Sequence, residues 1–265
     1  MRRLLKRLGG QTGYTMPELL ISCAIMGLVV SGIFGVYSTT LVQVTQASSL
    51  EDAQSSLRAG LDRMAADLRV AGSYYANVTG GGAPITAATA TTVTFMADID
   101  ADSVTGTTET VLASAATGTA ATLTGVPAAF NTYATASTND WLHVANGSTR
   151  EVRQVASVSG SVATLATGLT NTFPSGSLVR AVERVTYTFD SSARTLSRQV
   201  GGAAADVLAD NVTGMTLTYY GSTGTSLGST PGTLSDIFEL EVTLTTAGSD
   251  GSRRTMATRV RLRNS

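Results

Sequence analysis

The chain has 265 residues, of which 43% are hydrophobic and 14% charged, so it is long and apolar enough to bury a core. Four of its 18 basic residues precede Gly13 and none of its 19 acidic residues does, so the remainder carries a net charge of about −5. This balance argues against a general nucleic-acid-binding surface. One cysteine and one histidine argue against a disulfide, a zinc site or a Ser–His–Asp triad, so we do not expect an enzyme.

A basic leader and a long apolar run open the chain. The leader contains Arg2, Arg3, Lys6 and Arg7. Residues 19–50 contain no charged side chain, and residues 19–36 are mostly apolar, which is close to the length that a membrane-spanning helix needs. Because basic residues stay on the cytoplasmic side, we expect a transmembrane segment with a cytoplasmic leader. The alternative is a conventional secretory signal, cleaved after the apolar run near Ser31 or Ser38.

Between the leader and the apolar run stands the string Gly-Tyr-Thr-Met-Pro-Glu, residues 13–18, in which Glu18 is the first acidic residue of the chain. A carboxylate costs several kcal/mol in hydrocarbon, about 2.5 to 3.5 on insertion scales, so an acid at the edge of a membrane segment suggests a function. The alternative is an interfacial glutamate that caps a helix N-terminus, where the macrodipole favours negative charge. Pro17 suits the first turn of such a helix.

This string, with the basic leader before it and the apolar run after it, resembles the prepilin signal of type IV pilins and pseudopilins. The resemblance implies that a prepilin peptidase cuts after Gly13 and methylates the new N-terminal amine of Tyr14. Family members more often carry Phe or Met at that position. The resemblance also implies that this amine meets Glu18 of an adjacent subunit and sets the axial register of a helical assembly.

After the apolar run, apolar residues recur at spacings of three, four and seven, which predicts one face of a helix. These residues are Leu50, Leu57, Leu61, Met64, Leu68 and Ala71. The other side carries Glu51, Asp52, Arg58, Asp62, Arg63, Asp67 and Arg69, which we interpret as a solvated face. Gly72 predicts the end of the helix. A helix from residue 15 to 71 would be roughly 85 Å long, more than one globular domain requires, so we expect the excess to serve a membrane or an assembly.

From residue 73 onward, Thr, Ser, Ala and Gly dominate, and short alternating runs between turn residues predict β-structure. The expected strands are 93–95, 141–144, a hairpin of 151–158 with 161–166, 185–189 with 195–200, and 238–244 with 256–262. The last four segments look like the best-defined sheet. The part from 76 to 138 has few charges and weak periodicity, so we expect it to be rich in loops or to form a separate lobe.

Two further segments resemble PilW-type minor pilins. Residues 67–72, followed by Tyr74, resemble the end of their N-terminal helix. Tyr187, the turn from Asp190 and the return strand with Leu196 and Arg198 resemble their Tyr-containing strand, turn and Leu-x-Arg strand. The resemblance implies an α+β, pilin-like fold with a leader (1–13), an assembly helix (14–72) and a β-rich head (73–265), for which a second lobe stays open.

The expected function is that of a minor pilin that primes assembly of a type IV pilus at the inner membrane and lies at or near the pilus tip. The implied partners are the prepilin peptidase, other minor pilins, the major pilin and the assembly platform. The implied locations are the inner membrane, with a periplasmic head, and then the cell surface. One alternative is a J-type minor pseudopilin of a type II secretion system. Another is a signal-anchored adhesin that needs no processing at Gly13.

An acidic constellation suggests calcium. Asp98, Asp100 and Asp102 occupy alternate positions, and Glu109 follows at the spacing of the last ligand in an EF-hand-type loop. Ser103 stands where the sharp turn of that loop normally requires glycine, and the flanking residues predict strands rather than helices. The alternatives are therefore a calcium site or a solvated acidic turn.

Overall fold

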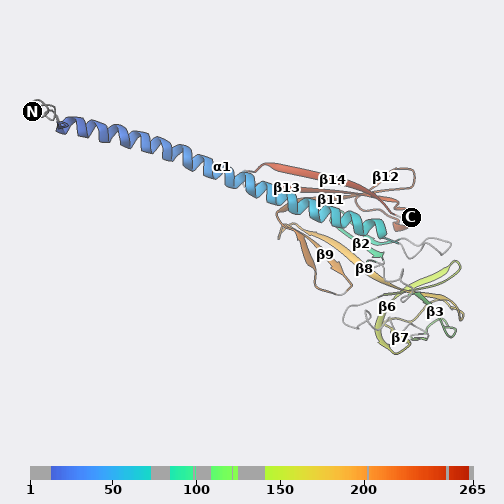
Figure 1. The fold of residues 1–265 in the computed structure, drawn as a ribbon. Coiled ribbons are helices and arrows are strands. Elements are labelled where there is room, and N and C mark those ends of the chain that lie inside the picture. The colour runs from blue at the N-terminus through green and yellow to red at the C-terminus, as the bar shows by residue number, and fades with distance from the viewer. Residues whose placement is uncertain are drawn as a thin grey trace, which may run out of the picture. The chain divides into compact units, whose positions relative to one another are not determined.

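The computed structural model describes residues 13–72, 84–97, 99, 109–120, 122–124, 141–201, 203–248 and 251–262. The chain divides into two compact units, residues 1–49 and residues 50–265. Helix α1 (Met16–Val70) is followed by antiparallel strands that account for most of the remaining described chain, as Figure 1 shows. This arrangement confirms the expected α+β class, with one long apolar N-terminal helix and a β-rich C-terminal part.

Helix α1 ends where the glycine signal predicts. Its last residue is Val70, and Gly72 adopts a φ of 72°, a left-handed conformation that glycine reaches without a steric penalty. The N–H of Gly72 then donates to the carbonyl of Met96 at 3.0 Å, and Ala71 forms an isolated bridge with Ala97. The chain therefore leaves the helix directly into contact with a strand.

The apolar stripe on the second half of α1 is confirmed, with two adjustments. Leu57, Leu61, Met64 and Leu68 are all buried, whereas Leu50 is only half-buried. The buried face also includes small residues between them: Ala53, Gly60 and Ala65. A Cβ added to Gly60 would lie 3.4 Å from side-chain atoms of both Leu196 and Ala209, so this glycine allows a close approach of the helix to strands.

Ten described strands form one antiparallel sheet. They are β1 (Ile85–Ala88), β2 (Thr92–Ala97), β3 (Glu109–Val111), β4 (Thr122–Thr124), β5 (Trp141–Asn146), β6 (Thr149–Ser159), β7 (Val162–Leu165), β8 (Leu178–Asp190), β9 (Thr195–Val200) and β10 (Asp206–Ala209). Strand β8 is central: its first half pairs with β3 and β5, and its second half pairs with β2 and β9. The expected β6–β7 hairpin forms around Gly160, whose φ is 60°.

Four described strands form a second, smaller sheet in the order β12–β11–β13–β14. Their bounds are β11 (Val212–Tyr220), β12 (Ser226–Gly228), β13 (Glu239–Ala247) and β14 (Arg253–Arg261), and a short 3-10 helix, η3 (Leu234–Asp236), precedes β13. Strands β13 and β14 pair over nine consecutive positions without a register shift. Sequence analysis did not predict β11, although its apolar side chains alternate in the usual way.

The expectation that the last four predicted segments share one sheet is wrong. The first two form β8–β9 in the large sheet, and the last two form β13–β14 in the small sheet. One apolar core joins the second half of α1 to both sheets, with Met64 from the helix, Tyr187 from β8 and Leu240 from β13 among its members. Alternation within each hairpin predicted which face is buried, but it could not distinguish one sheet from two that share a core. A second apolar cluster lies among β4–β7 and the first half of β8.

Candidate membrane and assembly site

The first unit presents an apolar surface. All residues from 13 to 45 are exposed, and they include large side chains such as Leu20, Leu28 and Phe34, which are 69%, 75% and 69% exposed. By length and composition, α1 contains a segment that could cross a membrane. Water disfavours a contiguous apolar surface of this size, so a surface of this kind marks contact with lipid or with other proteins.

Glu18 lies in the first turn of α1, where it forms half of a capping box. Its Oε2 atom accepts hydrogen bonds from the backbone N–H of Thr15 at 3.0 Å and from the hydroxyl of Thr15 at 2.9 Å. Thr15 precedes the first helical residue, and the carboxylate three residues later satisfies its N–H, as in the Thr-x-x-Glu motif. The cap that the sequence left open as an alternative is therefore present, and Gly13 and Tyr14 lie just outside it, with Tyr14 85% exposed.

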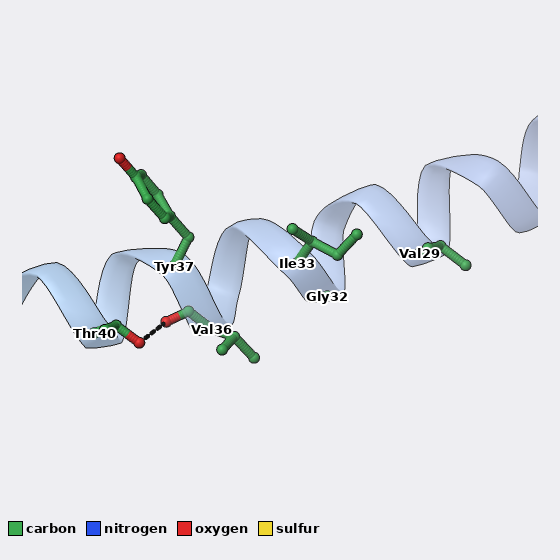
Figure 2. Close-up of a pocket in the computed structure, with 6 residues that line it drawn as sticks. All are labelled: Val29, Gly32, Ile33, Val36, Tyr37 and Thr40. Atoms are coloured by element: carbon green, nitrogen blue, oxygen red, sulfur yellow. Dashed lines mark hydrogen bonds between the residues drawn. The ribbon is translucent and has the colours of Figure 1, made fainter.

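A shallow, open hollow lies on one face of α1 farther along the apolar run. Figure 2 shows its lining residues at helical spacing: Val29, Gly32, Ile33, Val36, Tyr37 and Thr40. The hydroxyl of Thr40 donates to the carbonyl of Val36 at 2.9 Å, so this polar group is satisfied within the helix. A Cβ added to Gly32 would meet no atom within 4 Å, so glycine here leaves the backbone accessible. Small residues at such places let another helix approach closely in a membrane.

The second unit holds a buried ionic cluster centred on Asp67, which is only 4% exposed. Its Oδ2 atom accepts a hydrogen bond from the Tyr187 hydroxyl at 2.7 Å and another from Nε of Arg198 at 2.6 Å. Its Oδ1 atom pairs with Nε of Arg63, one turn earlier, at 3.3 Å. Helix α1 and strands β8 and β9 are thus tied together through one carboxylate.

The surroundings of the cluster keep both Tyr187 and Arg198 protonated. Burial, and then the Asp67 carboxylate, raise the pKa of Tyr187, so its hydroxyl stays protonated and donates. Burial, the largest single effect, opposes the charge of Arg198, but the hydrogen bond and the negative charge of Asp67, with smaller contributions from Tyr187, together outweigh burial and raise the pKa of the guanidinium. These contacts join one helix to two strands through buried polar groups, so the cluster acts as a structural clamp.

The sequence interpretation of Asp67 as part of a solvated face is wrong. A signal was available: Asp67 lies three residues after Met64 and four before Ala71, so it falls on the same stripe as the apolar residues. Two of its three partners, Tyr187 and Arg198, lie more than 100 positions later. The resemblance to PilW-type minor pilins had marked Asp67 and these two residues, but sequence analysis did not connect them.

The acidic constellation falls mostly outside the described residues. Asp98, Asp100 and Asp102 lie there, between β2 and β3, and of Glu109 only the backbone is described, as the first residue of β3. Strands therefore flank the acidic segment on both sides, as the sequence predicts. No group of side chains that could hold a metal ion occurs within the described ranges. The calcium site stays a prediction.

Comparisons with protein-family models, with curated proteins and with solved structures found no match. The functional interpretation therefore depends on the residues of this chain.

Proposed function

We propose that this protein is a minor pilin, most similar to the PilW type, that primes type IV pilus assembly at the inner membrane and then lies at or near the pilus tip. In this proposal the protein is not an enzyme. It acts through packing of its N-terminal helix against the helices of other minor pilins and of the major pilin, after a prepilin peptidase has removed residues 1–13 and methylated Tyr14.

The observation that carries the proposal is the junction at residues 13–18. A glycine, an exposed aromatic residue and a glutamate in the first helical turn precede an apolar, fully exposed helical segment. Two features of the described chain support it further. The hollow around Gly32 suits helix packing, and the Asp67 clamp fixes the second half of α1 to the β-rich part.

The first prediction concerns the N-terminus. Protein isolated from native pili or membranes is expected to begin at Tyr14 and to carry a methyl group on its amine, because the peptidase would act after Gly13. Mass spectrometry of the N-terminal peptide measures both. An intact Met1 in functional pili, or cleavage beyond Val36, would reject the prepilin proposal.

The second prediction concerns Glu18. We expect Glu18→Ala to stay inserted in the membrane, because removing a carboxylate favours a spanning segment. The variant should nevertheless fail to co-purify neighbouring minor pilins, because the amine of Tyr14 in the adjacent subunit loses its counter-charge. The number of surface pili should fall severalfold. Glu18→Gln should keep part of the function through hydrogen bonding.

Thr15→Ala separates the helix-capping role of Glu18 from its proposed contact with a neighbouring subunit. This variant removes the hydroxyl that Glu18 holds but keeps the carboxylate. If Glu18 contacts a neighbouring subunit, Thr15→Ala should assemble far better than Glu18→Ala. Equal defects in the two variants, with normal cleavage verified by mass, would show that Glu18 is only a helix cap. Normal recovery of partners and pili with Glu18→Ala would lead to the same conclusion.

A further inference from the structure

Strand β14 forms one edge of the small sheet. Its single partner among the described strands is β13, and nine consecutive residue pairs join the two without a bulge. Figure 1 shows β14 as the outermost strand of this sheet. The strand contains no proline, and Thr255, Ala257 and Arg259 along it are exposed. Bulges and prolines are common protections of a sheet edge, and β14 has neither.

The free hydrogen-bonding groups of this edge can be assigned. The N–H of Leu262 donates to the carbonyl of Phe238, and the N–H of Gly248 donates to the carbonyl of Ser252. Because groups in an antiparallel pair alternate between the two sides of a strand, the even-numbered residues of β14 face β13. The odd-numbered residues, 253 to 261, therefore direct their N–H and C=O groups away from the sheet. They form a regular row to which another strand could bind.

The edge is also strongly basic in a chain that is otherwise acidic. Strand β14 carries Arg253, Arg254, Arg259 and Arg261, and all four are exposed. Arg259 is held by Glu239, at 2.5 Å, and lies over the ring of Tyr220, with 3.8 Å between the guanidinium carbon and the ring centroid. Within the described part of the chain, the other three arginines form no ion pair.

This charge pattern selects the partner. If two copies of β14 paired antiparallel about Ala257, Arg253 of each would face Arg261 of the other, and like charges opposite one another destabilise a strand pair. Pairing of two copies over the full length of β14, in this register, is therefore disfavoured. A strand with acidic residues at alternate positions would instead satisfy both the backbone row and the two unpaired arginines on one face, Arg253 and Arg261.

We propose that the free edge of β14 binds an extended acidic segment of another protein, which adds as a fifth strand to the small sheet. Backbone hydrogen bonds from residues 253, 255, 257, 259 and 261 would supply much of the affinity, and the arginines would select acidic partners. This site goes beyond the proposed pilin function and does not depend on processing at Gly13.

The test uses the full chain in detergent and a fluorescent peptide as long as β14, in which glutamate alternates with valine. We expect salt-sensitive binding by fluorescence anisotropy, and no binding of the matched peptide with lysine in place of glutamate. The double variant Arg253→Ser and Arg261→Ser should weaken binding more than tenfold. Arg58→Ser, which removes an exposed positive charge from α1, is the matched control and should bind normally.

Ala257→Pro tests the strand contact itself. The N–H of Ala257 points away from β13, and proline is tolerated at an edge strand whose N–H faces solvent. We expect this variant to bind the acidic peptide more than tenfold more weakly, whereas Ala257→Ser should bind like the wild type. In the wild-type protein, bound peptide should slow amide hydrogen exchange at the odd-numbered residues of β14, a measurement that does not depend on the folding of the proline variant.

Three outcomes would overturn the proposal. The first is that the acidic peptide does not bind. The second is that binding depends on the arginines but is unaffected by Ala257→Pro, which would mean a charged patch that attracts any anionic surface. The third is that bound peptide leaves amide exchange in β14 unchanged. The peptide would then bind elsewhere, or the arginines would serve only to prevent self-association of the edge.

Discussion

Replacing Asp67 with alanine is expected to lower the free energy of unfolding of residues 50–265 by about 3 kcal/mol, the lower end of the range for breaking a buried ion pair. The substitution leaves the Arg198 guanidinium, whose side chain is 11% exposed, without the carboxylate that its Nε contacts at 2.6 Å. It also removes the acceptor of the buried Tyr187 hydroxyl. For a unit of this size the loss corresponds to a fall in Tm of roughly 6 to 12 °C.

Thermal unfolding of the full chain in detergent, followed by the fluorescence of Trp141, measures this effect. Trp141 is the single tryptophan of the chain and lies in β5, so its signal reports on the β-rich part. The matched control is Asp62→Ala, an exposed acid on the same helix, which should change stability by less than about 0.5 kcal/mol. Equal effects of the two substitutions would contradict the clamp.

Tyr187→Phe separates the hydrogen bond from the ion pair. It removes only the hydroxyl that donates to Asp67, and hydrogen bonds to charged groups contribute about 1.5 to 3 kcal/mol. Because both substitutions affect one cluster, the double variant should lose less than the sum of the single losses.

Sequence predicted the local structure of this protein well. The apolar run and the periodic stripe after Leu50 gave a helix from residue 15 to 71, and the structure has α1 over Met16–Val70. Gly72 ended it as expected, because a left-handed residue stops the helical hydrogen-bond pattern. The hairpins β6–β7, β8–β9 and β13–β14 were also predicted, since alternation and turn residues are local signals.

Long-range features were harder to predict. Nothing in the alternation of β8–β9 and β13–β14 says that they belong to different sheets around one helix. Charge also misled the interpretation of Asp67: its place on the apolar stripe indicated burial, but the partners that make burial of a carboxylate acceptable, Tyr187 and Arg198, lie on strands far away in sequence. By contrast, the cap at Glu18 is local, and the spacing Thr-x-x-Glu could have revealed its partner Thr15.

His143 gives the chain a titratable group that is fully buried. It lies in the middle of β5, opposite Arg180 of β8 on one side and Val152 of β6 on the other. Burial, and then the positive charges of Arg150 and Arg180, lower the pKa of His143 to about 4. The imidazole is therefore neutral in the folded protein at pH 7, whereas in the unfolded chain it titrates near its ordinary value of about 6.5.

The lowered pKa of His143 makes the stability of the folded protein depend on pH. The stability associated with neutral His143 is fully present above pH 6.5 and is lost as the pH falls towards 4, because the unfolded chain then binds a proton that the folded chain excludes. Between pH 7.5 and pH 5 this loss amounts to about 2 kcal/mol. We expect denaturant unfolding, followed by Trp141 fluorescence, to show this decrease in the wild-type protein.

His143→Leu should remove that part of the pH dependence, whatever the substitution does to stability at pH 7.5. Other groups that titrate in this range contribute equally to both proteins, so the difference between the two pH profiles isolates His143. Since the chain contains one histidine, NMR of its imidazole protons also gives the folded-state pKa directly. A measured value near 6.5 in the folded protein, or the same pH profile in His143→Leu, would mean that water or an acidic partner reaches the imidazole and that burial between β6 and β8 does not exclude its proton.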